Sequence, residues 1–181
     1  MTKIFAHRGA SAYAPENTME AFELAAKQGA DGIELDVHVT KDGEVVVTHD
    51  EKIDRVSNGS GFIKDMTLRE LKRLSFHNHM ESYVGAGIPT LREVLEYVST
   101  TNMDVNIELK TGIYWYPQIE EKTAFIVQET GMHDRVIYSS FNHHSIAKIK
   151  EIDSTAETAW LFSDVILNVE QYAKANGVEG L

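Results

Sequence analysis

The stretch of sequence that decides the fold is Gly32-Ile33-Glu34-Leu35-Asp36-Val37-His38, in which apolar and polar side chains alternate. Successive side chains of a strand point to opposite faces, so a strand here carries three aliphatic groups on one face and two carboxylates and an imidazole on the other. In a half-exposed antiparallel sheet this is ordinary, because solvent covers the polar face. In a parallel sheet both faces are covered, and inward-pointing carboxylates are costly unless ionic partners or a metal compensate them.

The chain around this stretch alternates short strands with amphipathic helices. Strands are predicted at residues 4–7, 32–40, 44–49, 105–109, 136–140 and 158–162, and helices at residues 17–27, 90–98, 117–131, 144–152 and 165–176, with another strand beginning at Val178. Repeated βα units indicate a parallel sheet, either closed as a (β/α)8 barrel or open and doubly wound. A closed barrel needs eight strands and about 250 residues. Five βα units and the start of a sixth are present, so either the sheet is open or the chain lacks the end of a larger domain.

Residues from about 51 to 88 differ from the rest, with loop-rich sequence and one helix opened by the capping box Thr67-x-x-Glu70. A segment this short is expected to lack a core of its own. We interpret it as an insertion within a single domain that spans residues 1–181. Just before it, Asp42-Gly43 predicts a two-residue hairpin loop, whose register would place Asp36 opposite His49, with Cβ atoms about 5 Å apart.

Composition limits the chemistry. The 181 residues carry a formal net charge of −11 and include no cysteine, which excludes disulfides, thiolate zinc sites, iron–sulfur clusters and a cysteine nucleophile. A chain this acidic is not expected to bind nucleic acid, because phosphate backbones require clustered Lys and Arg. No secretory signal and no apolar segment of roughly 20 residues is present, so a cytoplasmic location without a transmembrane segment is the default expectation.

A second predicted strand repeats the polar pattern of the first. In Val105-Asn106-Ile107-Glu108-Leu109-Lys110 the asparagine, the glutamate and the lysine share one face, and His7 ends the predicted strand at 4–7. Interior-facing polar ends of barrel strands are where this architecture builds active sites. Three carboxylates from two strands offer only oxygen ligands, which suits Mg²⁺, Ca²⁺ or Mn²⁺ rather than zinc.

Seven residues are therefore expected to converge on one rim of the sheet: His7, Arg8, Glu34, Asp36, His49, Glu108 and Lys110. They provide two groups for proton transfer, a divalent-cation site and two cationic side chains. This combination fits phosphoryl transfer or phosphodiester hydrolysis better than hydride, glycosyl or acyl chemistry.

Short motifs along the chain resemble those of the glycerophosphodiester phosphodiesterases, relatives of the phosphatidylinositol-specific phospholipases C. The motifs are His7-Arg8-Gly9, Pro15-Glu16-Asn17-Thr18, Glu34-Leu35-Asp36-Val37, Thr40-Lys41-Asp42-Gly43, His49-Asp50, Asp54-Arg55, Pro89-Thr90-Leu91 and Glu108-Leu109-Lys110. Each is weak alone, but their order and spacing together are specific. The resemblance implies an α/β fold, a (β/α)8 TIM barrel with a small insertion after strand 2, here truncated by about two βα units.

The resemblance also implies the role of each site residue. It implies that Glu34, Asp36 and Glu108 hold Mg²⁺ or Ca²⁺, that His7 and His49 are the general acid/base pair, and that Arg8 and Lys110 hold the phosphate. The implied reaction cleaves a small-molecule glycerophosphodiester to sn-glycerol 3-phosphate and an alcohol. The attacking group would be the substrate's own glycerol hydroxyl, activated at the metal, and water would open the resulting cyclic phosphate. The truncated chain is expected to be weakly active or inactive, and homo-oligomerisation is left open.

Two alternative functions stay open beside this one. A lysophospholipase D acting on lipid needs an apolar entrance, for which Tyr114-Trp115-Tyr116 is the candidate, although local loop packing is the favoured interpretation of that motif. A non-catalytic phosphodiester-binding barrel is expected to have lost a catalytic histidine, whereas both are present. Asp50 and Asn17 are expected to support the site by orienting His49 and the first loop.

Overall fold

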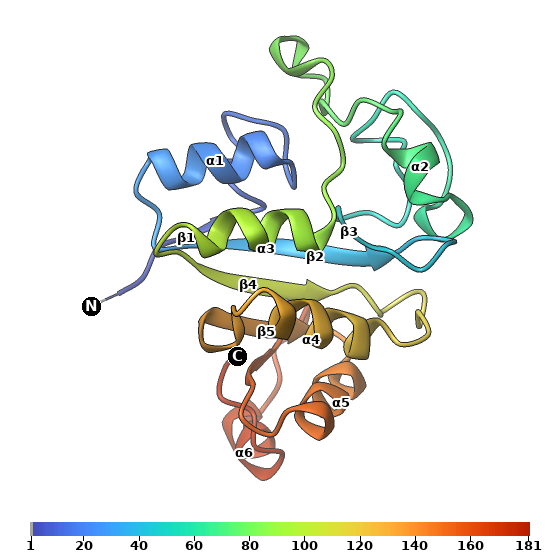
Figure 1. Cartoon of the computed structure of the whole chain (residues 1–181). Coiled ribbons are helices and arrows are strands. Elements are labelled where there is room, and N and C mark those ends of the chain that lie inside the picture. Colours follow the sequence, from blue (N-terminus) through green and yellow to red (C-terminus); the bar gives the residue numbers. More distant parts are fainter. Residues whose placement is uncertain (1) are drawn as a thin grey trace.

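The computed structural model describes residues 2–181, and strands alternate with helices along them (Figure 1). The strands are β1 (Phe5–His7), β2 (Gly32–Val39), β3 (Val45–Val47), β4 (Asp104–Leu109), β5 (Val136–Ser140) and β6 (Glu157–Trp160). The α-helices are α1 (Met19–Lys27), α2 (Leu68–Leu71), α3 (Leu91–Ser99), α4 (Ile119–Glu129), α5 (His143–Ile152) and α6 (Val169–Ala175). Short 3₁₀ helices lie at Ile63–Asp65, Glu81–Tyr83 and His133–Arg135.

The strands form one sheet in the order β1-β2-β4-β5-β6, all parallel, and β3 pairs with β2 in antiparallel orientation. Gly180 makes a parallel bridge to Ala159 of β6, where a further strand begins. This is the βα progression of a (β/α)8 barrel through five strands and the first bridge of a sixth. Within residues 2–181 the sheet is open, with β1 at one edge.

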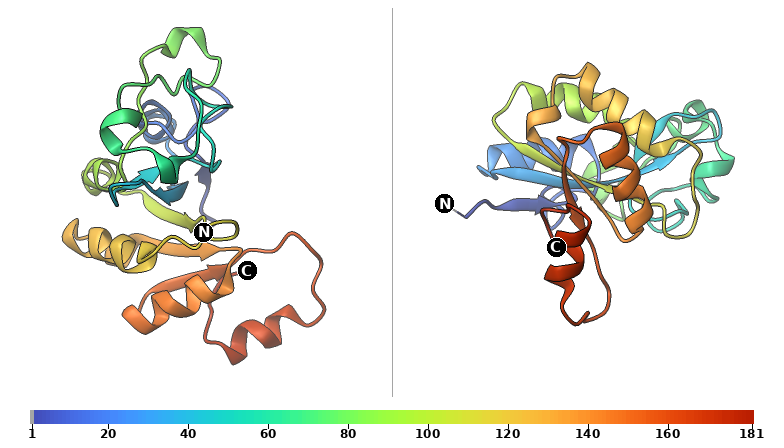
Figure 2. Two further views of the ribbon diagram at one scale, coloured as in Figure 1. Left: turned by 90° about the vertical axis from the view of Figure 1, so that its right-hand side faces the viewer. Right: turned by 90° about the horizontal axis from the view of Figure 1, so that it is seen from below.

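The alternation along β2 divides its side chains between two environments. Ile33, Leu35 and Val37 are fully buried in the main apolar core, together with side chains of α1, α3, α4 and α5. The last three of these helices lie along the same face of the sheet (Figure 2). The predicted parallel sheet with its aliphatic face turned toward helices is therefore confirmed. The opposite face is left for the polar residues of β2.

Most predicted elements appear within a few residues of their expected bounds, and β5 matches its prediction. The capping boxes of Thr67 and Thr90 both form. Helices α4 and α6 begin at Ile119 and Val169, two and four residues later than predicted. Gln118 and Asn168 precede them with φ values of 63° and 57°, and this left-handed conformation cannot belong to a right-handed helix.

The predicted hairpin register was wrong by one residue. Asp36 faces Thr48 rather than His49, because the loop between β2 and β3 contains three residues instead of two. Thr40 closes this loop through its backbone N–H and its hydroxyl, which both bond to the residue after Gly43. Gly43 has a φ of 89°, the left-handed conformation that a three-residue hairpin loop needs at its last position.

The insertion at residues 51–88 holds a small core, contrary to the expectation that it would have none. The buried members of this cluster are Val46, Ile53, Val56, Ile63, Leu71, Phe76 and Ile88. Val46 belongs to β3, so the cluster is attached to the main sheet through the hairpin. Apolar residues scattered over a loop-rich segment have no regular period, and the sequence pattern therefore did not reveal that they gather.

Candidate active site

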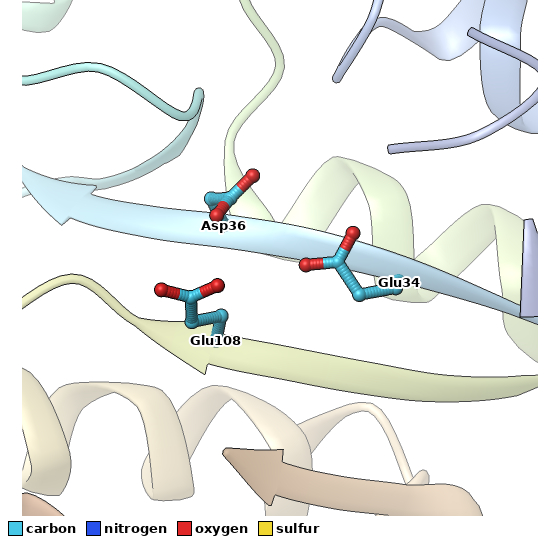
Figure 3. Close-up of side chains that lie close together, drawn as sticks. All are labelled: Glu34, Asp36 and Glu108. Carbon is cyan, nitrogen blue, oxygen red and sulfur yellow. The ribbon is translucent and has the colours of Figure 1, made fainter. Parts of the chain in front are cut away.

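Three carboxylates gather on the face of the sheet opposite the main core. Glu34 and Asp36 come from β2 and Glu108 from β4, and Asp36 is the register partner of Glu108. One oxygen of each carboxylate lies within 4.8 Å of the others. Figure 3 shows the three groups pointing toward one another across the two neighbouring strands. Their exposed fractions are 8%, 0% and 8%, so little solvent is available to screen their charges.

Burial and mutual repulsion disfavour the charged forms of this cluster. Burial raises the pKa of Glu34, and the charge of Asp36 raises it further. Burial also raises the pKa of Glu108, against the hydrogen bond that it accepts from Lys110. A bound divalent cation would reverse both effects, because it compensates the negative charges directly.

The surroundings of Asp36 provide a test of whether a cation fits. Its Oδ2 accepts a hydrogen bond from Nδ2 of Asn17 at 2.9 Å. Its Oδ1 is buried and accepts no hydrogen bond from residues 2–181, although Nζ of Lys110 lies 3.6 Å away. A buried carboxylate oxygen with a free lone pair, next to two further carboxylates, is a suitable ligand for a hard cation. The residues present therefore fit a divalent ion such as Mg²⁺ or Ca²⁺.

Two cationic side chains flank the carboxylates. Arg8 and Gly9, with φ values of 57° and 78°, turn the chain sharply after β1, and the backbone N–H of Arg8 donates to Glu34 at 3.0 Å. The buried Nε of Arg8 lies 3.6 Å from Oδ2 of Asp36 and donates no hydrogen bond within residues 2–181. Lys110 donates to Oε1 of Glu108 at 2.8 Å. Both cationic groups therefore border the carboxylate cluster.

The two histidines approach the cluster by different routes. His7 ends β1, and its Nε2 lies 3.8 Å from Oε2 of Glu34. Partial burial and the neighbouring charge of Arg8 lower the pKa of His7. His49 lies beyond the end of β3, so it does not reach the site through the strand pairing that was predicted. It lines a cavity of about 290 Å³ together with Glu108.

A chain of charged side chains joins His49 to Arg8. Nδ1 of His49 donates to Asp50 at 2.6 Å, and Nε of Arg55 donates to the same carboxylate at 2.7 Å. Arg55 also donates two hydrogen bonds of 2.8 Å to Glu16, which accepts a further one from Arg8 at 3.1 Å. Glu16 and Arg55 are thus functional candidates that the sequence analysis missed as a pair. Their presence in two of the quoted motifs was the only available signal.

The cavity beside the carboxylates has one polar and one apolar wall. Its polar lining is His49, Glu51, Glu108 and Lys110, and its apolar lining includes Ile113 and Phe141. Trp115 lies in the same loop as Ile113 and is 67% exposed, whereas Tyr116 is buried. Burial in the loop, the interpretation favoured for Tyr114-Trp115-Tyr116, therefore holds for Tyr116 but not for Trp115. A larger cavity of about 700 Å³ lies between α4 and α5 and contains none of the seven predicted site residues.

The amino-acid sequence of the chain is also similar to that of one protein family. The sequence profile of the Glycerophosphoryl diester phosphodiesterase family matches residues 7–179. The chain belongs to this family. A glycerophosphodiester phosphodiesterase from Caldanaerobacter subterraneus subsp. tengcongensis is 51% identical over 152 residues, which cover 83% of the chain and 63% of that protein. One from Bacillus altitudinis is 48% identical over 182 residues, covering 99% of the chain and 74% of that protein.

Solved structures of glycerophosphodiester phosphodiesterases and related proteins share the fold. A phosphodiesterase from Oleispira antarctica, in complex with the product sn-glycerol-3-phosphate, superposes with a TM-score of 0.92 at 28% identity, covering 98% of the chain and 73% of that protein. A glycerophosphodiester phosphodiesterase from Agrobacterium tumefaciens gives a TM-score of 0.80 at 38% identity, with coverage of 88% and 66%. The chain thus spans 63% to 74% of the length of these four proteins, and less than two thirds of the first of them. The predicted (β/α)8 barrel class is confirmed.

None of the helices in residues 2–181 has both the length and the apolar character needed to cross a bilayer.

Proposed function

We propose that this member of the glycerophosphoryl diester phosphodiesterase family hydrolyses glycerophosphodiesters to sn-glycerol 3-phosphate and an alcohol, with a divalent cation as cofactor. The observation that carries the proposal is the buried group Glu34, Asp36 and Glu108, in which Oδ1 of Asp36 accepts no hydrogen bond from residues 2–181. In this proposal residues 1–181 act as one barrel domain. The product complex of the Oleispira phosphodiesterase supports the choice of substrate class.

The chain's own residues divide the work between binding and proton transfer. Glu34, Asp36 and Glu108 hold the cation, which when bound supplies Lewis-acid stabilisation of the negative phosphodiester. Arg8 and Lys110 hold the phosphoryl oxygens, because their cationic groups border the carboxylates. A protein with a net charge of −11 needs these positive charges, since its overall field repels an anionic substrate.

The proton transfers require two groups on opposite sides of the scissile bond. In the first step one histidine takes the proton of the substrate's glycerol hydroxyl while that oxygen forms a bond to phosphorus. The other histidine gives its proton to the departing alcohol oxygen as the P–O bond breaks, which leaves a cyclic phosphate. In the second step the roles reverse, and water opens the ring. Nδ1 of His49 is bonded to Asp50, so Nε2 is the atom of His49 that exchanges the proton.

The test is release of sn-glycerol 3-phosphate from glycerophosphocholine, followed by ³¹P NMR. We expect turnover to stop with EDTA and to return with Mg²⁺ or Ca²⁺ added separately. Asp36→Asn should reduce turnover by about 100-fold or more, because even residues that only support metal ligands contribute roughly 10–100-fold. The matched control is Glu96→Gln, which removes an exposed carboxylate of α3. Binding of glycerophosphocholine without any turnover would instead favour a non-catalytic phosphodiester-binding barrel.

A second candidate activity is that of a lysophospholipase D. It is favoured by the apolar side chains beside the carboxylates, since Ile113 and Phe141 line the cavity there and Trp115, two residues after Ile113, is 67% exposed. An acyl chain can rest on such a surface. Comparing lysophosphatidylcholine with glycerophosphocholine decides between the two. A lipid enzyme should lose activity on lysophosphatidylcholine when Trp115→Ala is introduced, but not with Phe125→Ala, which removes an exposed aromatic ring from α4.

A further inference from the structure

His38 is a buried histidine for which the proposed reaction has no use. It lies on β2 two residues after Asp36, on the same face, and is 0% exposed. Both of its ring nitrogens are nevertheless engaged. Nε2 lies 3.0 Å from the backbone carbonyl oxygen of His49, and Nδ1 lies 3.0 Å from the hydroxyl oxygen of Tyr116. The two rings also meet edge to face, with centroids 5.6 Å apart.

The chemistry of the partners fixes the direction of both hydrogen bonds. A carbonyl oxygen can only accept, so Nε2 of His38 carries the hydrogen and donates it to His49. Nδ1 is then the acceptor of the neutral ring, and the Tyr116 hydroxyl donates to it. Both ring nitrogens of His38 have a hydrogen-bond partner in this buried series of hydrogen bonds, so the geometry selects one tautomer of His38. The result is a directed connection from Tyr116 through His38 to the backbone of His49.

We propose that His38 and Tyr116 are positioning residues that hold the backbone of His49 and connect it to the loop between β4 and α4. This inference rests on the proposed function for the role of His49 in proton transfer. The pairing of β3 with β2 ends at the backbone hydrogen bond from Thr48 to Asp36, so strand pairing does not hold His49. Asp50 fixes its side chain, and His38 fixes its main chain.

The connected loop is the one that borders the candidate substrate cavity. It begins after Lys110 and carries Ile113, which lines the cavity's apolar side, and the exposed Trp115. Its buried residue Tyr116 is the anchor that reaches His38. Contacts between the substrate and this loop can therefore affect the placement of His49, although the loop does not touch the imidazole that transfers the proton. Small displacements of a catalytic group can lower turnover by up to about 100-fold.

Three variants separate the two hydrogen bonds. Tyr116→Phe removes only the hydroxyl that donates to Nδ1. His38→Gln replaces the ring but keeps an amide NH₂ group able to reach the His49 carbonyl, and His38→Leu removes both bonds. The matched control is Tyr138→Phe, which removes the hydroxyl of a buried tyrosine from the helix-facing side of β5. Thermal denaturation of each variant shows whether the fold is intact.

The first measurement is steady-state kinetics with glycerophosphocholine and the cofactor cation. We expect kcat to fall on the order of tenfold in His38→Leu and less in Tyr116→Phe, with partial rescue in His38→Gln and KM changed by less than about twofold. Tyr116→Phe should have no further effect when added to His38→Leu, because the first change already removes its acceptor. Independent, multiplying effects of the two changes would overturn the proposal.

The second measurement does not depend on turnover. In a ¹H–¹⁵N correlation spectrum of the histidine rings, the His49 signals are identified by their loss in His49→Asn. Tyr116→Phe should shift or broaden them, although Tyr116 contacts His38 and not the His49 ring, whereas Tyr138→Phe should leave them in place. Unchanged His49 signals in Tyr116→Phe contradict the positioning role. If neither the wild-type chain nor a version lengthened to match its relatives shows turnover, the proposed function fails, and this spectrum still decides whether Tyr116 and His38 position His49.

Discussion

Arg55 donates two hydrogen bonds of 2.8 Å to Glu16, although the two residues lie 39 positions apart in the sequence. Arg55 also bonds to Asp50, so one guanidinium joins the loop after β1 to the segment after β3. These hydrogen bonds lower the pKa of Glu16, and they lower the pKa of Asp50 to about 2. This contact therefore links two separate parts of the candidate site, the loop that carries Arg8 and the segment that carries His49.

The first prediction concerns stability in acid. Glu16 and Asp50 have lower pKa values in the folded protein than the 4.5 and 3.8 of free groups, so the folded state binds fewer protons than the unfolded chain. Their stabilising contribution is complete above these free values and is lost as the pH falls toward about 2. Arg55→Met should therefore lower Tm at neutral pH and flatten its decrease in acid. Thermal denaturation across this range checks it, with Arg92→Met as the control. Parallel curves for Arg55→Met and the wild type would refute the prediction.

The second prediction concerns the orientation of His49. Asp50 can only accept a hydrogen bond, so it holds the hydrogen of His49 on Nδ1. Asp50→Asn introduces an amide that can also donate, which allows the wrong tautomer. We expect kcat to fall by about 100-fold or more, with a decrease in Tm no larger than that of Arg55→Met, which loses the bonds to both Asp50 and Glu16. Asp65→Asn, an exposed carboxylate in the insertion, is the control. A kcat equal to that of the wild type would show that Asp50 does not orient the imidazole.

The third prediction concerns the pH dependence of the reaction. Partial burial and the charge of Arg8 lower the pKa of His7 from 6.5, so His7 is neutral at pH 7 and can accept a proton. Activity should then be lost as the pH falls through a midpoint below 6.5. Arg8→Met removes one cause of the shift and should move the midpoint of kcat/KM upward. A midpoint that stays in place, or moves to lower pH, would contradict this account.

The fourth prediction concerns the carboxylates without their cation. The raised pKa of Glu34 shows that its charge is unfavourable in the metal-free protein. Glu34→Gln removes this charge and keeps an oxygen that can accept the backbone N–H of Arg8. Its Tm without metal should therefore be higher than that of the wild type, whereas the rise in Tm with added Mg²⁺ or Ca²⁺ should be much smaller. Calorimetry with and without EDTA measures both, and Glu96→Gln should match the wild type in each. A lower metal-free Tm in Glu34→Gln would argue against repulsion within the cluster.

The placement of the three carboxylates could be predicted from the sequence because the strand period is strict. Alternation along β2 and β4 assigns Glu34, Asp36 and Glu108 to one face, and parallel pairing brings that face together. The hairpin was not predictable to the same precision. Its register depends on whether Thr40 closes a loop of two or three residues, a matter of side-chain hydrogen bonds that the Asp-Gly signal does not contain.

The residues that support the histidines were the least predictable part of the site. His38 shares the polar face of β2, but its bond to Tyr116 joins positions 78 residues apart. The pair Arg55 and Glu16 is similarly distant. Sequence periodicity places side chains on faces of their own element, whereas contacts between loops depend on how separate elements pack.

The position of β2 between β1 and β4 affects how the protein is made. All seven candidate site residues lie between His7 and Lys110. Each lies on β1, β2 or β4, or just after β1, β3 or β4. Synthesis proceeds from the N-terminus, so every residue of the proposed cation site has been synthesised before β5 begins at Val136. In the proposed function, a divalent cation bound by Glu34, Asp36 and Glu108 would join β2 to β4 during synthesis, and the later βα units would then assemble onto an edge that is already ordered.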